Sequence, residues 1–195
     1  MLTKLNETEK LDPRVLRTRF AIETAFRQVL AEKSFQAISV QDITEKAGVN
    51  RTTFYLHFAD KYALLDYAVD QSFHQEMEKR MLNACHFSPA NLRALMVTVS
   101  EFIRQSHTTC GQVDPQFDAL VEPRVKKRLQ ELLGLWAEQA SPGSDARNTA
   151  TAASWAIYGL ALQWNHTRKR SDVESFADQV LPIIGGILGV AEKTT

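Results

Sequence analysis

The chain has 195 residues, its 23 basic and 23 acidic side chains give a formal net charge of zero, and 44% of its residues are hydrophobic. These values are ordinary for a soluble globular protein, and they exclude a protein that is basic over its whole surface. The N-terminal MLTKLNETEK is polar, no apolar run approaches the roughly 20 residues that span a bilayer, and two cysteines make no disulfide framework. We therefore expect a cytoplasmic protein with no membrane contact.

The first predicted helix runs from Pro13, which suits a helix start, to about Lys33. Its inward face is predicted from apolar residues at helical spacing: Leu16, Ile22, Ala25, Phe26, Val29 and Leu30. Its beginning also contains Arg14, Arg17 and Arg19, although a helix N-terminus is an unfavourable place for cations. Two interpretations stay open: a solvated helix start, or a group of side chains that contact phosphates.

The segment Ser39–Lys61 contains signals for two short helices joined by a tight turn. Ser39 and Asp42 have the spacing of a capping box at the start of the first helix. Gly48 suits a left-handed C-cap, and Asn50 suits the N-cap of the second helix. A helix, a short turn and another short helix have the dimensions of a helix-turn-helix.

The second helix of this segment is predicted over Arg51–Phe58. Phe54 and Phe58, at i and i+4, are its plain core residues. Its polar side chains have the reach to enter a major groove: Arg51, Thr52, Thr53, Tyr55 and His57. Arg51 can pair bidentately with guanine and a threonine methyl can contact thymine, whereas a backbone contact by Arg51 is the alternative.

The segment Arg17–Leu65 resembles the DNA-binding domain of the TetR family of bacterial transcriptional regulators. The family pattern of AGVS, any residue, GTLY, any residue, HF, two residues and K is present here as AGVNRTTFYLHFADK. Thr52 stands where the family often has glycine, and Asn50 replaces the usual serine cap. Because of Thr52 and Arg51, the operator of a relative is an unsafe guide to the operator of this chain.

The resemblance implies an all-α fold with two domains. Residues 1–61 would form a helix-turn-helix DNA-binding domain with an N-terminal arm, and residues 62–195 a helical effector-binding and dimerisation domain. The resemblance also implies base-edge contacts by Arg51, Thr52 and Thr53, and phosphate contacts by Tyr55, His57 and Lys61. Gln41 and Thr44, on the preceding helix, are further candidate phosphate contacts. Arg17 is a candidate because it lies just ahead of the helix-turn-helix.

Five helices are predicted after the helix-turn-helix, at 61–82, 90–106, 121–139, 146–166 and 171–190, with an irregular link from His107 to Pro115. In the resemblance, the last two helices form the interface of a homodimer, and an ordinary monomeric core is the alternative. One recognition helix contacts only a few base pairs, whereas two helices about 34–36 Å apart read a palindrome. The glycines near residue 186 favour another helix passing very close.

The resemblance places an effector pocket among the remaining helices. Its candidate lining residues are aromatic or soft side chains, which are more often core than pocket: Met96, Phe102, Phe117, Trp136, Trp155 and Tyr158. Two pairs of zinc-type ligands are present, Cys85 with His86 and His107 with Cys110. Their spacing matches no known closed metal site, and a metal or redox role stays open. No catalytic or cofactor motif is present in the sequence.

The sequence therefore predicts a homodimeric one-component regulator, by the family's usual behaviour a repressor, that acts at the bacterial nucleoid. It would bind a palindromic operator and be released by a small molecule that the sequence does not identify. The alternative is an effector-independent architectural DNA-binding protein on the same scaffold. A well-formed pocket connected to the helix at 61–82 would favour the first function, and a filled core would favour the second.

Overall fold

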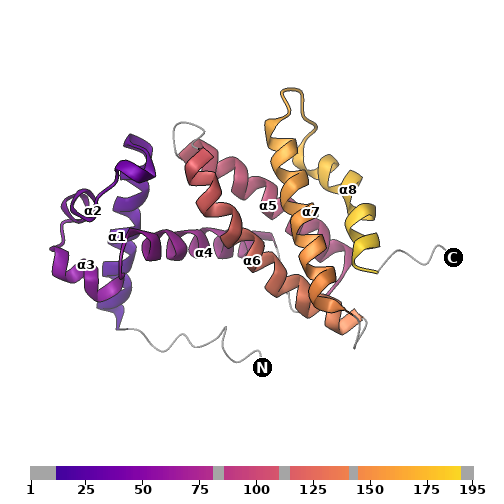
Figure 1. Cartoon of the computed structure of the whole chain (residues 1–195), viewed down its shortest axis with the longest axis horizontal. Helices are drawn as coiled ribbons and strands as arrows, with labels where there is room; N and C mark the ends of the chain where they lie inside the picture. Colours follow the sequence, from indigo (N-terminus) through magenta and orange to yellow (C-terminus); the bar gives the residue numbers. More distant parts are fainter. Residues whose placement is uncertain (1–11, 81–85, 110–114, 141–144, 190–195) are drawn as a thin grey trace. The chain divides into compact units, whose positions relative to one another are not determined.

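The structure is a computed structural model that describes residues 12–80, 86–109, 115–140 and 145–189, and in these ranges the only regular secondary structure is helical (Figure 1). The elements are α1 Pro13–Glu32, η2 Phe35–Ala37, α2 Val40–Ala47, α3 Arg51–His57, α4 Lys61–Arg80, α5 Pro89–Thr109, α6 Pro115–Ala140, α7 Ala146–His166 and α8 Val173–Ile187. The predicted all-α fold with an N-terminal helix-turn-helix is confirmed. None of the described helices is both long enough and apolar enough to cross a bilayer.

The described residues divide into two compact units, and the boundary lies inside α4, between Ala68 and Val69. The first unit contains η2, α1 to α3 and the beginning of α4. The second unit contains the rest of α4 and the helices that follow. The domain boundary predicted at residue 61 falls earlier, at the start of α4.

Local side-chain bonds set the ends of α2 and α3. The backbone N–H of Asp42 donates to the Ser39 hydroxyl at 3.1 Å, and the backbone N–H of Ser39 donates to the Asp42 carboxylate at 2.7 Å. Gly48 ends α2 in the left-handed region at φ 66°, and the backbone N–H of Thr53 donates to the Asn50 side chain at 2.7 Å. The capping residues predicted from the sequence are confirmed, and they define the turn between the two helices.

The left-handed backbone at Gly48 gives a first testable prediction. A Cβ at this position would meet no atom within 4 Å, so alanine would be opposed by backbone strain alone. We predict that Gly48→Ala lowers the free energy of unfolding by about 1–2 kcal/mol in urea denaturation. Gly134→Ala is the matched control, because Gly134 lies in α6 without positive φ and a Cβ there would meet only the Ala150 Cβ, at an ordinary contact distance of 3.9 Å. Equal destabilisation by both substitutions would contradict the strain argument.

Aromatic and aliphatic side chains from all four helices form the core of the first unit, including Ile22, Phe26, Phe35, Ile43, Phe54 and Leu64. Two ion pairs join α1 to α2, Lys33 with Asp42 at 2.7 Å and Lys46 with Glu32 at 2.6 Å. Leu16 was predicted on the inward face, but it is 49% exposed. The prediction is wrong at Leu16 because the buried face of α1 begins only at Ile22.

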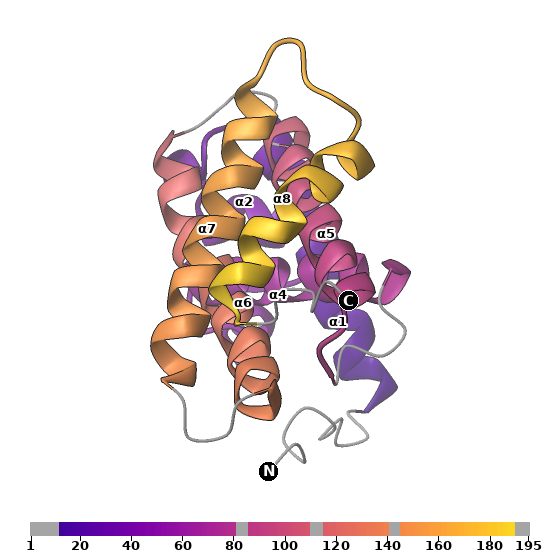
Figure 2. The same cartoon turned by 90° about the vertical axis from the view of Figure 1, so that its right-hand side faces the viewer.

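In the second unit, α7 packs along α6 on one side and along α8 on the other (Figures 1 and 2). The second half of α4 is tied to α5 by the edge-to-face rings of Phe73 and Phe102, whose centroids are 5.8 Å apart. It is tied to α6 by a bidentate ion pair between Asp70 and Arg128. These contacts define a helical body whose last two helices lie at one side.

Two helix boundaries differ from the prediction. The helix α5 continues through Thr109, because threonine lowers helix propensity only slightly and the first glycine comes at Gly111. The helix α6 begins at Pro115 instead of Val121. Phe117 and Val121 are both buried at i and i+4, so the periodic face starts one turn earlier than the sequence pattern indicated.

Candidate nucleic-acid interface

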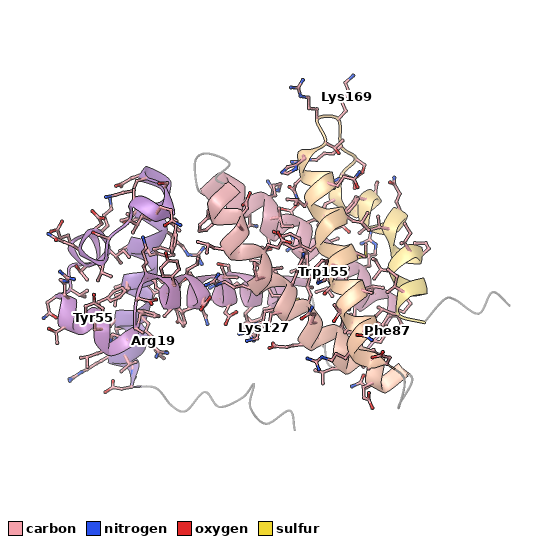
Figure 3. All side chains as sticks on the ribbon, in the orientation of Figure 1. Arg19, Tyr55, Phe87, Lys127, Trp155 and Lys169 are labelled. Atoms are coloured by element: carbon pink, nitrogen blue, oxygen red, sulfur yellow. The ribbon has the colours of Figure 1, made fainter. Side chains whose placement is uncertain are left out.

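The outward face of α3 is formed by four exposed residues at i, i+1, i+4 and i+5, namely Arg51, Thr52, Tyr55 and Leu56. Tyr55 is 49% exposed and Leu56 is 79% exposed (Figure 3 labels Tyr55). The opposite edge of the helix is anchored in the core by Phe54, which is fully buried. This division lets a helix of two turns pack by one edge and present the rest to a groove.

Leu56 is the residue of this face that the sequence prediction does not include. An isolated leucine ordinarily belongs to a core, and no polar group draws attention to it. The spacing contained the signal, because a residue two places after Phe54 cannot share the edge that Phe54 and Phe58 bury. Its exposed methyl groups have the chemistry for an apolar contact with a thymine methyl in a major groove.

The two candidate DNA-contacting residues on α2, Gln41 and Thr44, differ in their exposure to solvent. Gln41 is exposed, and its amide donates to the Glu45 carboxylate at 2.8 Å. Thr44 is only 3% exposed, and its hydroxyl donates to the backbone carbonyl of Gln41 at 3.0 Å. The structure therefore corrects the prediction for Thr44, whose hydroxyl lies inside the unit and is already bonded.

The three arginines of α1 separate into two kinds. Arg14 and Arg17 are exposed, so Arg17 keeps the availability that a phosphate contact needs. Arg19 is half-buried, and its guanidinium carbon lies 6.0 Å from the ring centroid of Phe58 and 5.7 Å from that of Tyr67. Arg19 therefore stacks on aromatic rings of α4 and of the α3 end, where its charge also acts on its neighbours.

His57 is one of the neighbours on which that charge acts. It is half-buried at the end of α3, and burial together with the positive Arg19 guanidinium lowers the pKa of His57 below its ordinary value. The neutral imidazole that results keeps one N–H donor.

Thr53, at the start of the same helix, is half-buried.

Lys61 differs from the other predicted phosphate donors. Its ammonium donates to three backbone carbonyls, those of Phe35 at 3.0 Å, Gln36 at 3.1 Å and Ile38 at 2.8 Å. An ammonium has three donors, so all of them are used within the chain. The predicted phosphate role of Lys61 therefore competes with contacts that the structure already contains.

Five of the six predicted pocket residues are buried in the second unit, and none of them is more than 6% exposed: Met96, Phe102, Phe117, Trp136 and Tyr158. Trp155 is 60% exposed, and the Lys126 ammonium lies 4.1 Å from its ring centroid. The structure corrects the prediction that Trp155 lines an interior pocket. Periodicity could not place it, because α7 is apolar on nearly every side.

A cavity of about 610 Å³ opens between α6 and α7. It is lined by Lys127, Gln130, Glu131, Gly134, Glu138, Ala146, Arg147, Ala150 and Thr151. It contains none of the predicted pocket residues and no residue of α4, so it is not the pocket that the sequence predicted.

Only some of the side chains that could bind a metal lie among the described residues. The residues that the structure describes contain no group of three or more His, Cys, Asp or Glu side chains that could hold a metal ion. Cys85 and Cys110 lie outside the described residues, as does the side chain of His107, while His86 is exposed.

Comparison with known sequences gives matches to part of the chain. The family model described as bacterial regulatory proteins, tetR family, matches residues 22–68. An HTH-type transcriptional regulator of Bacillus subtilis (strain 168), YxbF, is 47% identical over 68 residues, which are 34% of this chain and 18% of that protein. The chain thus matches less than a fifth of the length of this curated relative.

Solved structures of similar fold extend over both units. A TetR-family regulator from Streptomyces coelicolor A3 aligns with a TM-score of 0.66 at 20% identity, covering 92% of this chain and 98% of that one. A TetR transcriptional regulator from Streptococcus agalactiae 2603V gives 0.58 at 19% identity, covering 89% and 96%. The regulator FadR from Bacillus subtilis, in complex with stearoyl-CoA, gives 0.55 at 17% identity, covering 85% and 96%. These likenesses show a shared fold.

Proposed function

We propose, from the premise that the chain belongs to the TetR family of bacterial regulatory proteins, that it binds a palindromic operator as a homodimer and represses transcription until a small molecule releases it. Membership of this family implies a transcriptional regulator. The palindromic operator, the homodimer and the small-molecule effector are the further parts of our proposal. The proposed place of action is the nucleoid in the bacterial cytoplasm. The observation that carries the proposal is the exposed outward face of α3.

The side chains of this face suit two kinds of DNA contact. Arg51 and Thr52 stand at the exposed start of α3, where recognition helices reach base edges. Tyr55 and His57 follow within two turns and carry the donors that phosphate oxygens accept. The major groove is about 12 Å wide and admits one helix, so a two-turn helix anchored by Phe54 fits the task.

The lowered pKa of His57 gives a prediction for the pH dependence of DNA binding. In the free protein, burial and Arg19 hold the pKa of His57 below its ordinary value. A DNA phosphate against the imidazole would raise that pKa, so binding would take up a proton. We therefore expect the affinity for DNA to rise about twofold to tenfold as the pH falls from about 8 to about 6 at constant salt, since one pKa unit corresponds to a tenfold effect.

Two variants isolate the contribution of His57 in fluorescence anisotropy titrations. His57→Gln retains an N–H donor but does not titrate, so the pH dependence should become flat. His74→Gln is the control, because His74 lies on α4 and pairs with Glu78 at 3.1 Å. It should leave the pH dependence unchanged. A pH dependence that survives His57→Gln would contradict the proposed phosphate contact.

The dimer is supported by an apolar outward face on α7 and α8, the two helices nearest the viewer in Figure 2. The face consists of exposed residues at helical spacing: Ala152, Trp155 and Gly159 on α7, and Pro182, Ile183 and Gly186 on α8. Trp155 is 60% exposed and Ile183 is 55% exposed. We call this set the α7–α8 face. Exposed apolar side chains on two neighbouring helices favour a protein partner.

Two glycines support a second copy of the chain as the partner. Gly159 lies in the interior of α7, where glycine costs about 1 kcal/mol relative to alanine, and Gly186 lies in the last turn of α8. No atom of the described residues lies within 4 Å of a Cβ built on either glycine, so packing within the chain does not explain them. A helix of a second copy that approaches closely would explain both glycines, and a two-fold axis would match a palindromic operator.

Release by an effector would be a population shift between two spacings of the recognition helices, only one of which fits successive major grooves. FadR, which shares the fold, was crystallised with stearoyl-CoA, so in that protein the scaffold holds a small molecule. The burial of the predicted pocket residues favours the second candidate function, an effector-independent architectural DNA-binding protein. Release of bound operator in a metabolite screen would support the first candidate, and its failure across the screen would support the second.

The proposed function is tested by selecting bound fragments from sheared genomic DNA with the purified protein. The expected result is a small set of fragments that share an inverted repeat, and the adjacent genes would suggest the effector. An architectural protein would retain fragments without a common sequence. Retention of no DNA at low salt would contradict DNA binding altogether.

A further inference from the structure

The ammonium of Lys61 lies in a cage of carbonyls and aromatic rings. The three carbonyls that accept from it, on Phe35, Gln36 and Ile38, belong to η2 and the residue after it. The ammonium also lies 4.9 Å from the ring centroid of Phe35 and 5.8 Å from that of Tyr62. These two rings meet edge to face with centroids 5.2 Å apart. Carbonyl oxygens and ring faces are both attractive to a cation.

The start of α4 is also unsuited to receive a phosphate. The Asp60 carboxylate accepts from the backbone N–H groups of Tyr62 and Ala63, each at 2.8 Å. A helix N-terminus offers free N–H groups to an anion, but here a carboxylate of the chain already occupies two of them. Its negative charge would repel a phosphate placed beside Lys61.

We propose that Lys61 is a positioning residue, whose ammonium clamps the α1–α2 connection to the start of α4, and that it does not contact a DNA phosphate. Ser39, the cap of α2, follows directly after the last of the three carbonyls. The clamp therefore fixes where α2 begins and, through the turn at Gly48, how α3 is presented. This inference rests on the proposed function for its effect on DNA binding, whereas its effect on stability stands alone.

The stability of the fold is measured first, by thermal unfolding of the full-length protein. Lys61→Met keeps the length of the side chain but leaves three carbonyls without a donor, and we expect the melting temperature to fall by about 5–10 °C. Lys61→Arg keeps the charge, but a planar guanidinium cannot aim at three convergent carbonyls, so it should not restore the melting temperature. The control is Lys46→Met, which removes only the surface pair with Glu32 and should change it little.

DNA binding then separates positioning from phosphate contact, at a temperature where circular dichroism shows each variant fully folded. We expect Lys61→Met to leave the slope of log affinity against log salt concentration unchanged. The ratio of operator to random-DNA affinity should fall about tenfold, the size of losing one base contact. Simple destabilisation would lower both affinities equally and leave that ratio unchanged. Should Lys61→Met not fold, Lys61→Arg gives the same decision, with a lowered ratio and an unchanged slope.

The proposal is overturned if Lys61→Met lowers the salt slope by about 0.9 for each lost phosphate contact while Lys61→Arg restores slope, affinity and melting temperature. A wild-type protein that binds no DNA would contradict the proposed function instead. In that case the two melting temperatures would still decide whether the clamp exists, because an unchanged melting temperature in Lys61→Met would refute it.

Discussion

Replacing Ile183 by glutamate is expected to convert the proposed dimer into monomers and to weaken operator binding by about 10²–10⁴-fold, the gain that linking two binding sites provides. Ile183 is 55% exposed on α8 in the single chain. A Cβ built on Gly186, three residues later, would meet no other part of the described residues within 4 Å. A carboxylate at this position would be buried without a partner if a second copy covered it. In the free chain it would lie in water, so the fold itself should be unaffected.

The measurement is sedimentation velocity across protein concentration, followed by operator titration of the same samples. Leu135→Glu is the matched control, because Leu135 is 39% exposed in the same unit but lies on α6, outside the α7–α8 face. It should remain dimeric with wild-type affinity. A dimer that persists in Ile183→Glu would place the interface elsewhere, and dissociation of both variants would indicate general damage.

Replacing Arg51 by alanine is expected to change which DNA sequences the protein prefers. Arg51 is exposed at the first position of α3, and a bidentate contact between its guanidinium and guanine would contribute about 1–3 kcal/mol in each half-site. Operator affinity should fall accordingly, while affinity for random DNA should change much less. Selection from a random library should show relaxed preference at one position of each half-site.

Arg17→Ala is the comparison for Arg51, since Arg17 is also exposed but lies on α1, where the sequence predicts a phosphate contact. It should weaken all sequences to a similar extent and reduce the salt slope by about 0.9 per contact. If Arg51→Ala behaved in this same way, Arg51 would be a backbone contact and base reading would belong to other residues of the outward face.

The parts of the fold that the sequence predicted depend on local chemistry. The caps at Ser39, Gly48 and Asn50 bond to groups within five residues of each cap, so neighbouring letters are enough to predict them. The outward face of α3 was predictable in large part because two aromatic residues at i and i+4 define its buried edge. The same spacing places Leu56, two residues after Phe54, on the outward face.

The parts that the sequence could not predict depend on distant or absent partners. The carbonyls that accept from Lys61 lie 23 to 26 residues away along the chain, so no local pattern indicates them. The polar side chain of Thr44 is predicted from the sequence as a candidate phosphate contact, but the packing of α2 buries it. Trp155 looked like core because α7 is apolar on nearly every side, and which side stays exposed depends on the neighbouring helices.

The central claim is that two copies of the chain read one inverted repeat through α3. It is tested most directly by comparing the selected operator with the same operator carrying about five extra base pairs, half a helical turn, between its half-sites. Our account predicts that the insertion lowers affinity about 10²-fold or more, to the level of a single half-site, because the second recognition helix then faces the wrong side of the duplex. Unchanged affinity after the insertion would contradict it.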